Sequence, residues 1–238
     1  MIDAATVKAI ALSLGAEQCG IARAESFSAA PEGFRPVDIY PQCRSVVVFL
    51  KAMPAAITQA ANPAPYSNAA YLLYAELDHL GLELTRALER RGVPAVPLPC
   101  DAPYLHFDAA SQHGMGILSM RHAAQLAGLG RLGRNTLLMN EELGNLCYIG
   151  AVLTAAELEP DQPLEGSPCP EHCRVCQEAC PENALIGQTV IQARCRRRSI
   201  VTVGRDYSIY NCHLCRSKCP RSPGNRDLGW RKDYKIPV

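Results

Sequence analysis

The hydrophobic pattern predicts two amphipathic helices in the first part of the chain. Between residues 68 and 91 leucines recur at intervals of three and four, the spacing that places side chains on one face of a helix. They are Leu73, Leu77, Leu80, Leu84 and Leu88. A shorter repeat of the same kind predicts a helix over residues 6–14. Gly15 and Gly92 follow these two segments and mark their ends.

Continuous apolar runs predict the strands. Residues 45–50 form a β-branched run that suits a strand buried on both faces, and residues 146–153 form a second candidate. Residues 93–98 contain Pro94 and Pro97, which predicts an edge strand. We also expect a short strand at 20–22, a helix at 119–127 and an Ala- and Pro-rich loop at 54–65.

Composition and length place these elements in a class. The chain has 238 residues with 48% hydrophobic and 6% aromatic content, a balance that favours helices with parallel or mixed sheets. We expect a fold of the α/β or α+β class. The acidic, proline-containing stretch 157–168 is the best domain boundary, so we expect domains at 1–160 and 161–238. A secretory leader and a membrane-spanning run are not apparent, and we expect a cytoplasmic protein whose thiols stay reduced.

Cysteines dominate the second domain. Two runs each end in Cys-Pro, and a further cysteine lies between them. The eight residues are Cys169, Cys173, Cys176, Cys180, Cys195, Cys212, Cys215 and Cys219. Two [4Fe–4S] clusters need eight thiolates, and in two-cluster ferredoxins the cysteine before the proline ligates the other cluster. The spacing therefore predicts a ferredoxin-like module with two clusters.

The same rule divides the ligands between the clusters. The first set is Cys169, Cys173, Cys176 and Cys219, and the second is Cys180, Cys195, Cys212 and Cys215. Zinc held by four thiolates is the rival interpretation, but zinc ribbons do not usually repeat C-x3-C-P after each pair. For Cys19 and Cys147 we expect core packing. Cys43 and Cys100 lie near turns, where a structural role or a place facing a cofactor is open.

Charge is distributed unevenly between the two parts. Residues 190–238 carry 12 basic and 3 acidic residues, a net +9, whereas the first 189 residues carry 12 basic and 20 acidic, a net −8. The basic residues interleave with the cysteines, which favours compensation of the negative charge on thiolate-bound clusters. Binding of an anionic partner, nucleic acid included, is the alternative.

A glycine motif lies in the middle of the chain. Residues 128–133 fit G-x-G-x-x-G, but a dinucleotide site needs a strand before the motif and a helix after it. Here a predicted helix precedes the glycines, so we do not expect a Rossmann site. Glycines also allow a bulky cofactor to approach the backbone closely. On that basis the candidate cofactor-binding residues are Gly128, Gly130, Arg131, Gly133, Arg134 and Asn135.

The same segment closely resembles a signature of the epoxyqueuosine reductase family. Residues 127–138 read AGLGRLGRNTLL against the family's AGLGWIGKNTLL. Residues 19–24 resemble its VGIARA start, and 43–48 resemble its ARSVIV strand. Cys195 falls where the family has an isolated cluster cysteine, and residues 211–220 resemble its GCDxCQxVCP. The resemblance covers nearly the whole chain.

The resemblance implies a fold and a chemistry. The fold is a nitroreductase-like, corrinoid-binding sheet with flanking helices, followed by a ferredoxin-like module with two [4Fe–4S] clusters. Electrons would pass through the clusters to cobalamin, which would reduce an epoxide in a tRNA base, and a redox protein would supply them. A flavin is the alternative cofactor. The resemblance further implies a partner role for tRNA, which the basic segment 190–238 would serve.

Two departures from the family leave the reaction open. Its catalytic aspartate, in a VDTGPVLER segment, aligns with Gly114 here, so Asp108, His113 or His122 is the candidate proton donor and the catalytic residue is unknown. The helical repeats that follow in longer members are not in this sequence. We therefore expect an oxidoreductase of unknown substrate that resembles epoxyqueuosine reductases. The alternative is a non-catalytic electron carrier or adaptor.

Overall fold

A four-stranded antiparallel sheet organises the first part of the molecule. The computed structural model describes residues 2–103, 105–204 and 206–224. The sheet has the order β1-β2-β8-β3, and the three pairs of neighbouring strands are all antiparallel. Its strands are β1 Gln18–Arg23, β2 Ser45–Ala52, β8 Cys147–Thr154 and β3 Ala95–Leu98. The composition favoured a parallel or mixed sheet, and that part of the prediction was wrong because all three strand pairs are antiparallel. Helices that pack on an antiparallel sheet define an α+β fold.

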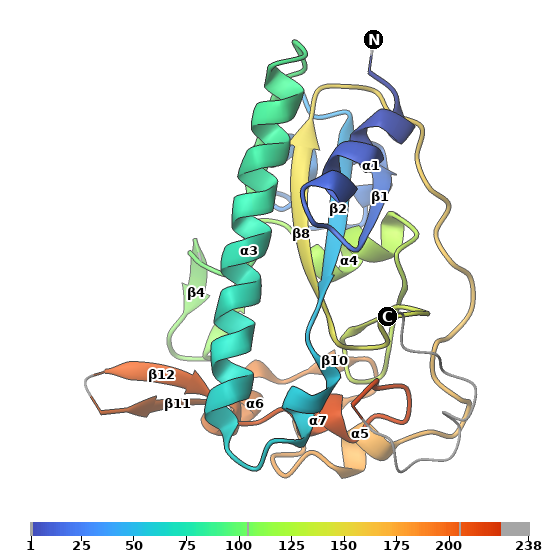
Figure 1. Cartoon of the computed structure of the whole chain (residues 1–238). Helices are drawn as coiled ribbons and strands as arrows, with labels where there is room; N and C mark the ends of the chain where they lie inside the picture. Colours follow the sequence, from blue (N-terminus) through green and yellow to red (C-terminus); the bar gives the residue numbers. More distant parts are fainter. Residues whose placement is uncertain (1, 104, 205, 225–238) are drawn as a thin grey trace.

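The two central strands are buried because helices cover both faces of the sheet. On one face lie α1 (Ala4–Ser13) and the long α3 (Pro63–Glu89), and on the other lies α4 (Met120–Leu126) (Figure 1). Along β2 the residues from Ser45 to Leu50 are all buried, as predicted for a strand covered on both sides. An antiparallel strand can therefore carry a continuous apolar run when both faces of its sheet are covered.

The helix α3 confirms the leucine repeat. Its five repeat leucines are buried against the sheet, four of them at 2% exposure or less. The helix begins at Pro63, earlier than the pattern indicated, because Asn62 caps the amide of Ala64 and proline is tolerated in the first turn. The predicted loop at 54–65 is thus partly wrong, since it also contains the 3-10 helix η2, Ala55–Gln59. Gly92 has a φ of +74° directly after the helix end.

The remaining predicted elements are close to those observed. The helices at 6–14 and 119–127 correspond to α1 and α4, and the strands at 20–22 and 146–153 correspond to β1 and β8. The proline-containing β3 lies at a sheet edge, as predicted. Short elements complete the first part: η1 Ala24–Phe27, α2 Pro36–Ile39, β4 His106–Asp108, β5 His113–Met115, β6 Arg131–Leu132 and β7 Leu138–Met139.

The cysteine-rich part consists of short elements at one end of α3. They are α5 Val175–Glu178, β9 Leu185–Ile186, β10 Thr189–Val190, α6 Gln192–Ser199, β11 Ile200–Val203, β12 Tyr207–Tyr210 and α7 Leu214–Ser217. The hairpin β11–β12 projects sideways, and its base is held against α3 by bonds from Ser67 and Tyr71 (Figure 1). The division at 161 places all of these elements in the second predicted domain, whose residues 225–238 lie outside the described residues.

The connection between the two parts runs along the outside of the sheet. Asp161 in this stretch accepts the backbone N–H of Ile21 at 2.8 Å and forms an ion pair with Lys8 at 2.6 Å. Gly20 shows how closely the elements approach nearby, because a Cβ on Gly20 would lie 2.2 Å from the carbonyl oxygen of Ala127. Only glycine allows β1 to lie this close to the end of α4.

Candidate cluster module and adjoining cavity

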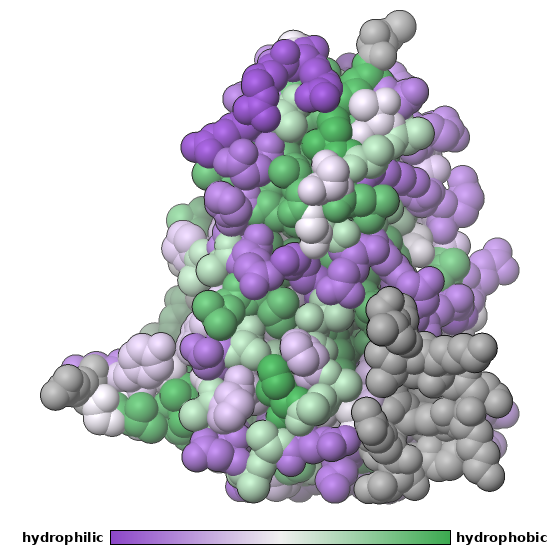
Figure 2. Space-filling view, in the orientation of Figure 1, coloured by the Kyte–Doolittle hydropathy of each residue, from purple (hydrophilic) through white to green (hydrophobic). Residues whose placement is uncertain are grey.

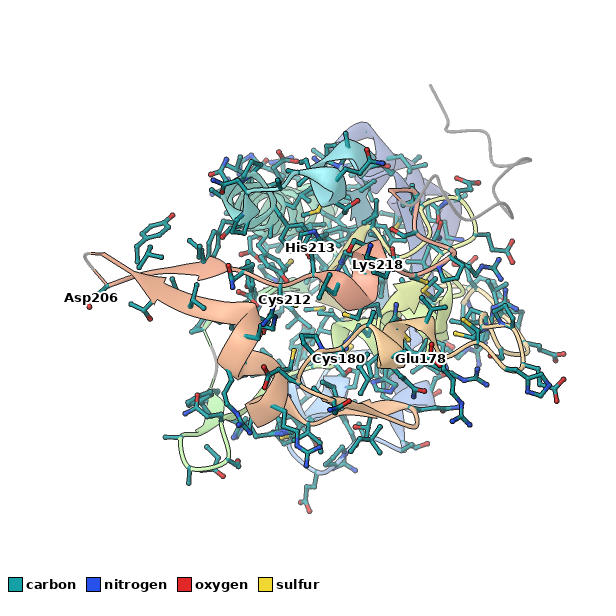
Figure 3. The ribbon with its side chains drawn as sticks, turned by 90° about the horizontal axis from the view of Figure 1, so that it is seen from below. Glu178, Cys180, Asp206, Cys212, His213 and Lys218 are labelled. Carbon is teal, nitrogen blue, oxygen red and sulfur yellow. The ribbon has the colours of Figure 1, made fainter. Side chains whose placement is uncertain are left out.

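Two short helices bring the two cysteine runs together. In the first run α5 carries Cys176, and in the second run α7 carries Cys215. The two helices pack against each other. Figure 3 looks onto this underside of the molecule, where Cys180 and Cys212 are labelled and Asp206 marks the tip of the projecting hairpin. Residues far apart in the sequence thus form one cysteine-rich end.

Four thiols gather around Cys176. Burial raises the pKa of the Cys176 thiol to about 11, and the nearby thiols of Cys219, Cys169 and Cys173 act in the same direction. The pKa of Cys219 is likewise raised to about 11, by burial and by Cys169 and Cys173. These four residues are the first predicted ligand set, including the cysteine that crosses over from the second run.

A second group surrounds Cys215. Burial raises the pKa of this thiol to about 12, and the thiols of Cys195, Cys212 and, from the first group, Cys176 contribute in the same direction. Cys180 accepts the backbone N–H of Ala184 on its sulfur at 3.4 Å. A hydrogen bond of this kind stabilises a thiolate and is one of the ways in which a protein tunes a cluster. Three members of the second predicted set are therefore electrostatically coupled.

The described residues contain no group of three or more His, Cys, Asp or Glu side chains placed to hold a single metal ion. A mononuclear zinc site needs its thiolates at about 2.3 Å from one point. The ligands of a polynuclear cluster bind different iron atoms and do not converge in this way. All twelve cysteines are free thiols rather than disulfides.

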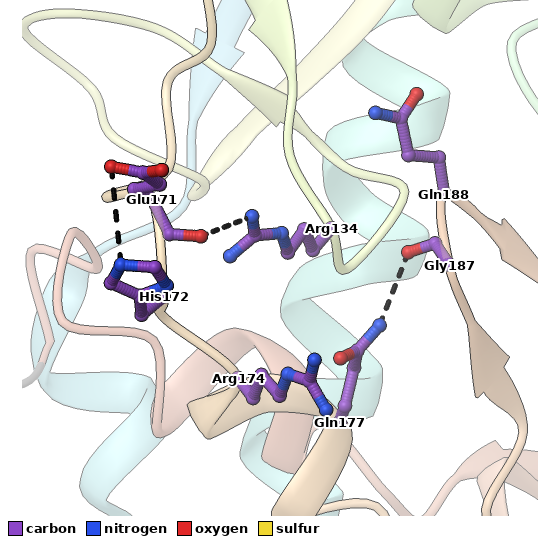
Figure 4. A pocket seen from close by; sticks show the side chains of 7 residues that line it. All are labelled: Arg134, Glu171, His172, Arg174, Gln177, Gly187 and Gln188. Carbon is purple, nitrogen blue, oxygen red and sulfur yellow. Dashed lines mark hydrogen bonds and ion pairs between the residues drawn. The ribbon is translucent and has the colours of Figure 1, made fainter.

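The glycine-motif segment contacts the cysteine module. The backbone N–H of Arg134 donates to the sulfur of Cys169 at 3.4 Å. Its guanidinium donates to the carbonyl oxygens of Pro170, Glu171 and Cys173, at 3.1, 2.6 and 2.5 Å. Figure 4 shows this guanidinium beside the loop that carries Glu171 and His172, in a cleft of about 430 Å³. One arginine thus fixes the whole first loop.

The other residues of this segment also contact the protein itself. Asn135 is buried and donates from its amide to the carbonyl oxygen of Cys215 at 3.3 Å. Arg131 binds Glu141 and the carbonyl oxygen of Glu165. Gly128 has a φ of +71°, and a Cβ on it would lie 2.7 Å from the carbonyl oxygen of Gln162. The segment lies between the sheet domain and the cysteine module, and a role for its six predicted residues in cofactor binding stays a prediction.

The large cavity of the molecule lies between the first part and α6. It has a volume of about 740 Å³, within the usual range of roughly 300–1,000 Å³ for small-molecule sites. Apolar walls come from the loop bearing Phe27 and Phe34 and from Leu118 and Leu126. Cys195 and Arg196 of α6 form part of the opposite wall. A predicted cluster ligand therefore borders the cavity.

Several titratable groups line this cavity. His113 and His122, two of the three candidate proton donors, belong to it, but Asp108 does not. Ser119 and His122 are hydrogen-bonded, with 2.7 Å between Oγ and Nδ1. Partial burial, together with the charge of Arg121, lowers the pKa of His122 below its usual value. The hydrogen bond to Ser119 orients the ring on the cavity wall.

Sequence reasoning missed Asp101. It is the one carboxylate among the described residues that line the cavity, and it accepts a hydrogen bond from the Tyr210 hydroxyl at 3.3 Å. Cys100 beside it also lines the cavity, so this cysteine faces a potential cofactor site, whereas Cys43 and Cys147 are buried in the core. Asp101 follows β3 and no motif surrounds it, so only the fold shows that it lines the cavity.

Gly114 is the residue that the resemblance aligns with the family's aspartate. It is buried in β5, and its backbone N–H and carbonyl group both bond to the side chain of Gln192, at 2.9 and 3.0 Å. Gln192 belongs to α6, the helix that carries Cys195. The hairpin β4–β5 is therefore joined to the helix that carries the predicted ligand Cys195.

The surface near the cavity mouth is basic and partly apolar. Arg194, Arg197 and Arg198 on α6 are exposed, and so are Val203 and Tyr207 on the projecting hairpin. Figure 2 shows hydrophobic side chains on this hairpin, while hydrophilic ones cover the far end of α3. Arg205 and the basic residues beyond 224 lie outside the described residues.

Comparison with solved structures defines the class of protein. Epoxyqueuosine reductase from Streptococcus thermophilus matches with a TM-score of 0.64 and 22% identity, over 91% of this chain and 65% of that one. A catabolic reductive dehalogenase in complex with 3-bromo-4-hydroxybenzoic acid matches with a TM-score of 0.65 and 23% identity, over 90% of this chain and 31% of that one. The fold is therefore the one shared by epoxyqueuosine reductases and reductive dehalogenases.

Sequence relatives narrow the class. Epoxyqueuosine reductase of Staphylococcus aureus is 34% identical over 120 residues, which span 46% of this chain and 31% of that protein. That of Bacillus anthracis is 33% identical over 119 residues, with the same coverage. No family model matches the chain. The chain is similar to epoxyqueuosine reductases in both sequence and fold, and its matching segment spans about a third of the curated relatives.

Other related structures bear on particular features. One shows an epoxyqueuosine reductase with an epoxyqueuosine-modified tRNA stem loop, at a TM-score of 0.60, 20% identity and 65% coverage of that chain. Another, from Bacillus subtilis, has an aspartate-bearing catalytic loop swung out of the active site. A reductive dehalogenase structure suggests a mechanism for B12-dependent dehalogenation. No helix among the described residues of this chain is long and apolar enough to cross a membrane.

Proposed function

We propose that this protein is a corrinoid-dependent reductase in which two [4Fe–4S] clusters pass electrons to a cofactor in the large cavity. The observation that carries the proposal is the position of Cys195, a predicted ligand of the second cluster that lines the cavity. A cluster bound there would lie directly beside the cofactor. The substrate remains open, and an epoxide in a tRNA base is the candidate taken from the relatives.

The donor set supports the clusters. The thiols of Cys169, Cys173 and Cys219 lie around Cys176, and those of Cys195 and Cys212 lie near Cys215, as expected of a crossed-over ferredoxin. The first cluster would be held by Cys169, Cys173, Cys176 and Cys219, and the second by Cys180, Cys195, Cys212 and Cys215. In this proposal residues 161–238 form the electron-delivering domain and residues 1–160 the cofactor and substrate domain.

The cavity supports a bound cofactor. Its walls combine apolar side chains with a few polar groups, which is typical of cofactor sites. A bound corrinoid would supply the two-electron reduction, and the protein would position it. Asp101, His113 and His122 are then the groups of this chain that can hold or deliver a proton at the cavity wall. A flavin in the same cavity is the alternative cofactor.

A partner role for tRNA follows from the basic surface around the cavity. Arg196 lines the cavity, and the exposed arginines of α6 continue this charge outside it. A polyanion bound there would place one of its bases at the cavity mouth. Affinity should then fall steeply as salt increases, because phosphate contacts release counterions. A redox protein is the expected electron donor.

A non-catalytic electron carrier is the second candidate. Gly114 favours it, because the position aligned with the family's aspartate carries no acid and its backbone is fixed to Gln192. In a carrier both clusters would still form. Whether the cavity binds a cofactor therefore distinguishes a reductase from an electron carrier, and the presence of clusters does not.

Two cavity-lining cysteines provide a matched test. Anaerobically purified protein should contain about eight iron atoms per chain, with an iron–sulfur absorption spectrum. Cys195→Ser should lose iron from one cluster, whereas Cys100→Ser, on the same cavity, should keep the full content. Wild-type protein should also bind cobalamin stoichiometrically by calorimetry, and Ala30→Trp, which fills the cavity, should abolish this binding without loss of iron.

The possible failures separate the two candidates. Zinc in place of iron, or full iron content in Cys195→Ser, would overturn the cluster assignment. Normal clusters without any binding of cobalamin or flavin would leave the electron carrier as the better description. Cobalamin binding that Ala30→Trp does not disturb would place the cofactor outside the cavity.

A further inference from the structure

Arg216 lies between the second cysteine group and the interior of the first domain. It follows Cys215 on α7, and its guanidinium donates to the backbone carbonyl of Asn145. The guanidinium carbon also lies 5.1 Å from the centre of the Tyr148 ring. Asn145 is completely buried and Tyr148 is 6% exposed, so the charged end of this half-buried side chain reaches into the core.

Among the residues that the structure describes, no carboxylate is paired with this charge. None of the ion pairs among the described residues includes Arg216. The groups that face it electrostatically are the tyrosines Tyr66, Tyr74 and Tyr148 and the thiol of Cys147. Burial raises the pKa of Tyr148 and of Tyr74 above the usual range and that of Cys147 to about 11. At neutral pH Tyr74, Tyr148 and Cys147 are therefore uncharged.

A cation in such a place needs a compensating charge. Removing a charged group from water costs several kcal/mol unless an opposite charge lies near, and arginine does not lose its proton in proteins. The tyrosine faces give a weaker, cation–π attraction. The strongest available counter-charge is a thiolate-bound cluster at Cys215, the residue that directly precedes Arg216 on α7.

The backbone around Arg216 is fixed to the first domain as well. The side-chain amide of Asn145 donates to the carbonyl oxygen of Arg216 at 2.9 Å, and that of Asn135 donates to the carbonyl oxygen of Cys215. Both asparagines are buried. The arginine is thus held in one place relative to Cys215, and its field on the second cysteine group is fixed.

We propose that Arg216 is the internal counter-charge of the second cluster and holds the reduction potential of that cluster more positive than a neutral residue would. The inference rests on the two-cluster proposal above. Reduction of a cluster adds one electron from the donor and breaks no bond, so it adds one negative charge beside the guanidinium. A fixed, poorly solvated cation stabilises that reduced state.

Because the second cysteine group lies beside the large cavity, the effect of Arg216 on its potential influences the direction of electron flow. The second group contains Cys195, which borders the large cavity. A more positive potential on the cluster nearest the cofactor favours transfer of electrons from the first cluster toward the cavity. Arg216 would therefore act through the second cluster, by holding a positive charge at a fixed place, and would not touch the cofactor itself.

The test is a pair of arginine substitutions that change net charge equally. Arg216→Met removes the charge near Cys215 and keeps the length of the side chain, whereas Arg197→Met removes an exposed charge two residues from Cys195. The solvent screens the charge of Arg197. Each anaerobically reconstituted protein is first analysed for iron and sulfide and then titrated with dithionite, with the reduced clusters followed by electron paramagnetic resonance.

We expect one of the two midpoint potentials to move to more negative values in Arg216→Met. The other midpoint should stay where it is, and both should be unchanged in Arg197→Met. Arg216→Lys, which keeps the charge, should have a midpoint potential close to that of the wild type. Unchanged midpoints in an Arg216→Met protein with full iron content would overturn the proposal.

A second outcome also decides the question. If Arg216→Met folds but loses the second cluster while Arg216→Lys keeps it, the charge is needed and the proposal is supported. Loss of that cluster in both variants would show that the shape of arginine matters rather than its charge, and would overturn it. Wild-type protein without clusters would instead refute the proposed function on which this inference rests.

Discussion

Gln192 holds Gly114 through both of its backbone groups. The side-chain amide accepts the Gly114 N–H at 2.9 Å and donates to the Gly114 carbonyl at 3.0 Å, as a neighbouring strand would. This contact joins the hairpin β4–β5 to the helix that carries Cys195. Gly114, which the resemblance aligns with the family's aspartate, is therefore part of the contact between the cavity wall and the cysteine-rich part.

Gln192→Ala should loosen this hairpin. Two hydrogen bonds are lost, each contributing about 1 kcal/mol, so amide exchange of Gly114 should accelerate by one to two orders of magnitude. Hydrogen–deuterium exchange with mass spectrometry of the peptide covering 106–116 measures this. Gln188→Ala, at an exposed position outside the large cavity, is the control. Equal exchange in wild type and Gln192→Ala would show that other contacts hold the hairpin.

Arg134→Ala should make the first cluster labile. The substitution removes three bonds from the guanidinium to the loop of Cys169 and Cys173 but keeps the backbone N–H that points at the Cys169 sulfur. Loss of these charge-assisted bonds costs about 1.5–3 kcal/mol each at most. We expect faster loss of absorbance in air and a lower iron content after gel filtration.

The neighbouring Arg174 provides the comparison for this prediction. It lines the same cleft of about 430 Å³ and is exposed. Arg174→Ala should therefore bleach at the wild-type rate. If both variants bleach equally fast, the positive charge of the cleft, rather than the bonds of Arg134, protects the cluster.

The native protein should react slowly with thiol reagents at pH 8. Eight cysteines are predicted ligands, and the other four have thiols that resist ionisation: burial raises the pKa of Cys19 to about 12, that of Cys43 and Cys147 to about 11, and that of Cys100 still higher. Because the thiolate is the reactive form, iodoacetamide should label none of them quickly. Removal of iron with a chelator should make further cysteines among the eight predicted ligands reactive by mass spectrometry, and fast labelling of Cys195 in the native protein would remove it from the ligand set.

Cys43 should make the fold less stable in alkali. Its pKa is raised by burial from about 9 to about 11, so above pH 9 the unfolded chain releases a proton that the folded protein keeps. The stability that the neutral thiol contributes is complete below pH 9 and is lost as the pH rises through 11. Over this window the loss is about 2 kcal/mol.

Thermal unfolding at pH 8 and pH 10 measures this loss. Cys43→Ala should lower the melting temperature at both pH values, but with a smaller difference between them than wild type. Val46→Ala, a truncation in the same core cluster without a titrating group, should keep the wild-type difference. A Cys43→Ala protein with the wild-type pH dependence would show that this thiol ionises normally in the folded state.

The helices and the buried strands were predictable because their signals are local. The leucines of α3 repeat with the period of a helix, and the run that forms β2 is continuous, so burial follows from spacing alone. The direction of the neighbouring strands is not local, and the composition favoured the wrong arrangement. The proline-bearing β3 was placed correctly at an edge because proline removes a hydrogen-bond donor wherever the strand lies.

The grouping of the cysteines was predictable from the sequence, whereas the contacts of the glycine-motif segment were not. The spacing of the cysteines predicted two groups, and the structure brings together the thiols of Cys176, Cys169, Cys173 and Cys219. The spacing around Arg134 and Asn135 indicated a cofactor, but nothing local indicates that these side chains bind the Cys169 and Cys215 loops. Contacts between segments far apart in sequence depend on how the whole chain packs.

The sequence by itself determined the elements, the cysteine pattern and the resemblance to epoxyqueuosine reductases, because periodicity and ligand spacing are properties of short segments. Only the tertiary structure decided that Cys195 and Asp101 line the large cavity, and that the side chain of Arg216, next to Cys215, bonds to Asn145. These relationships are distances through space. They arise when the packing of α6 and α7 against the sheet domain is fixed.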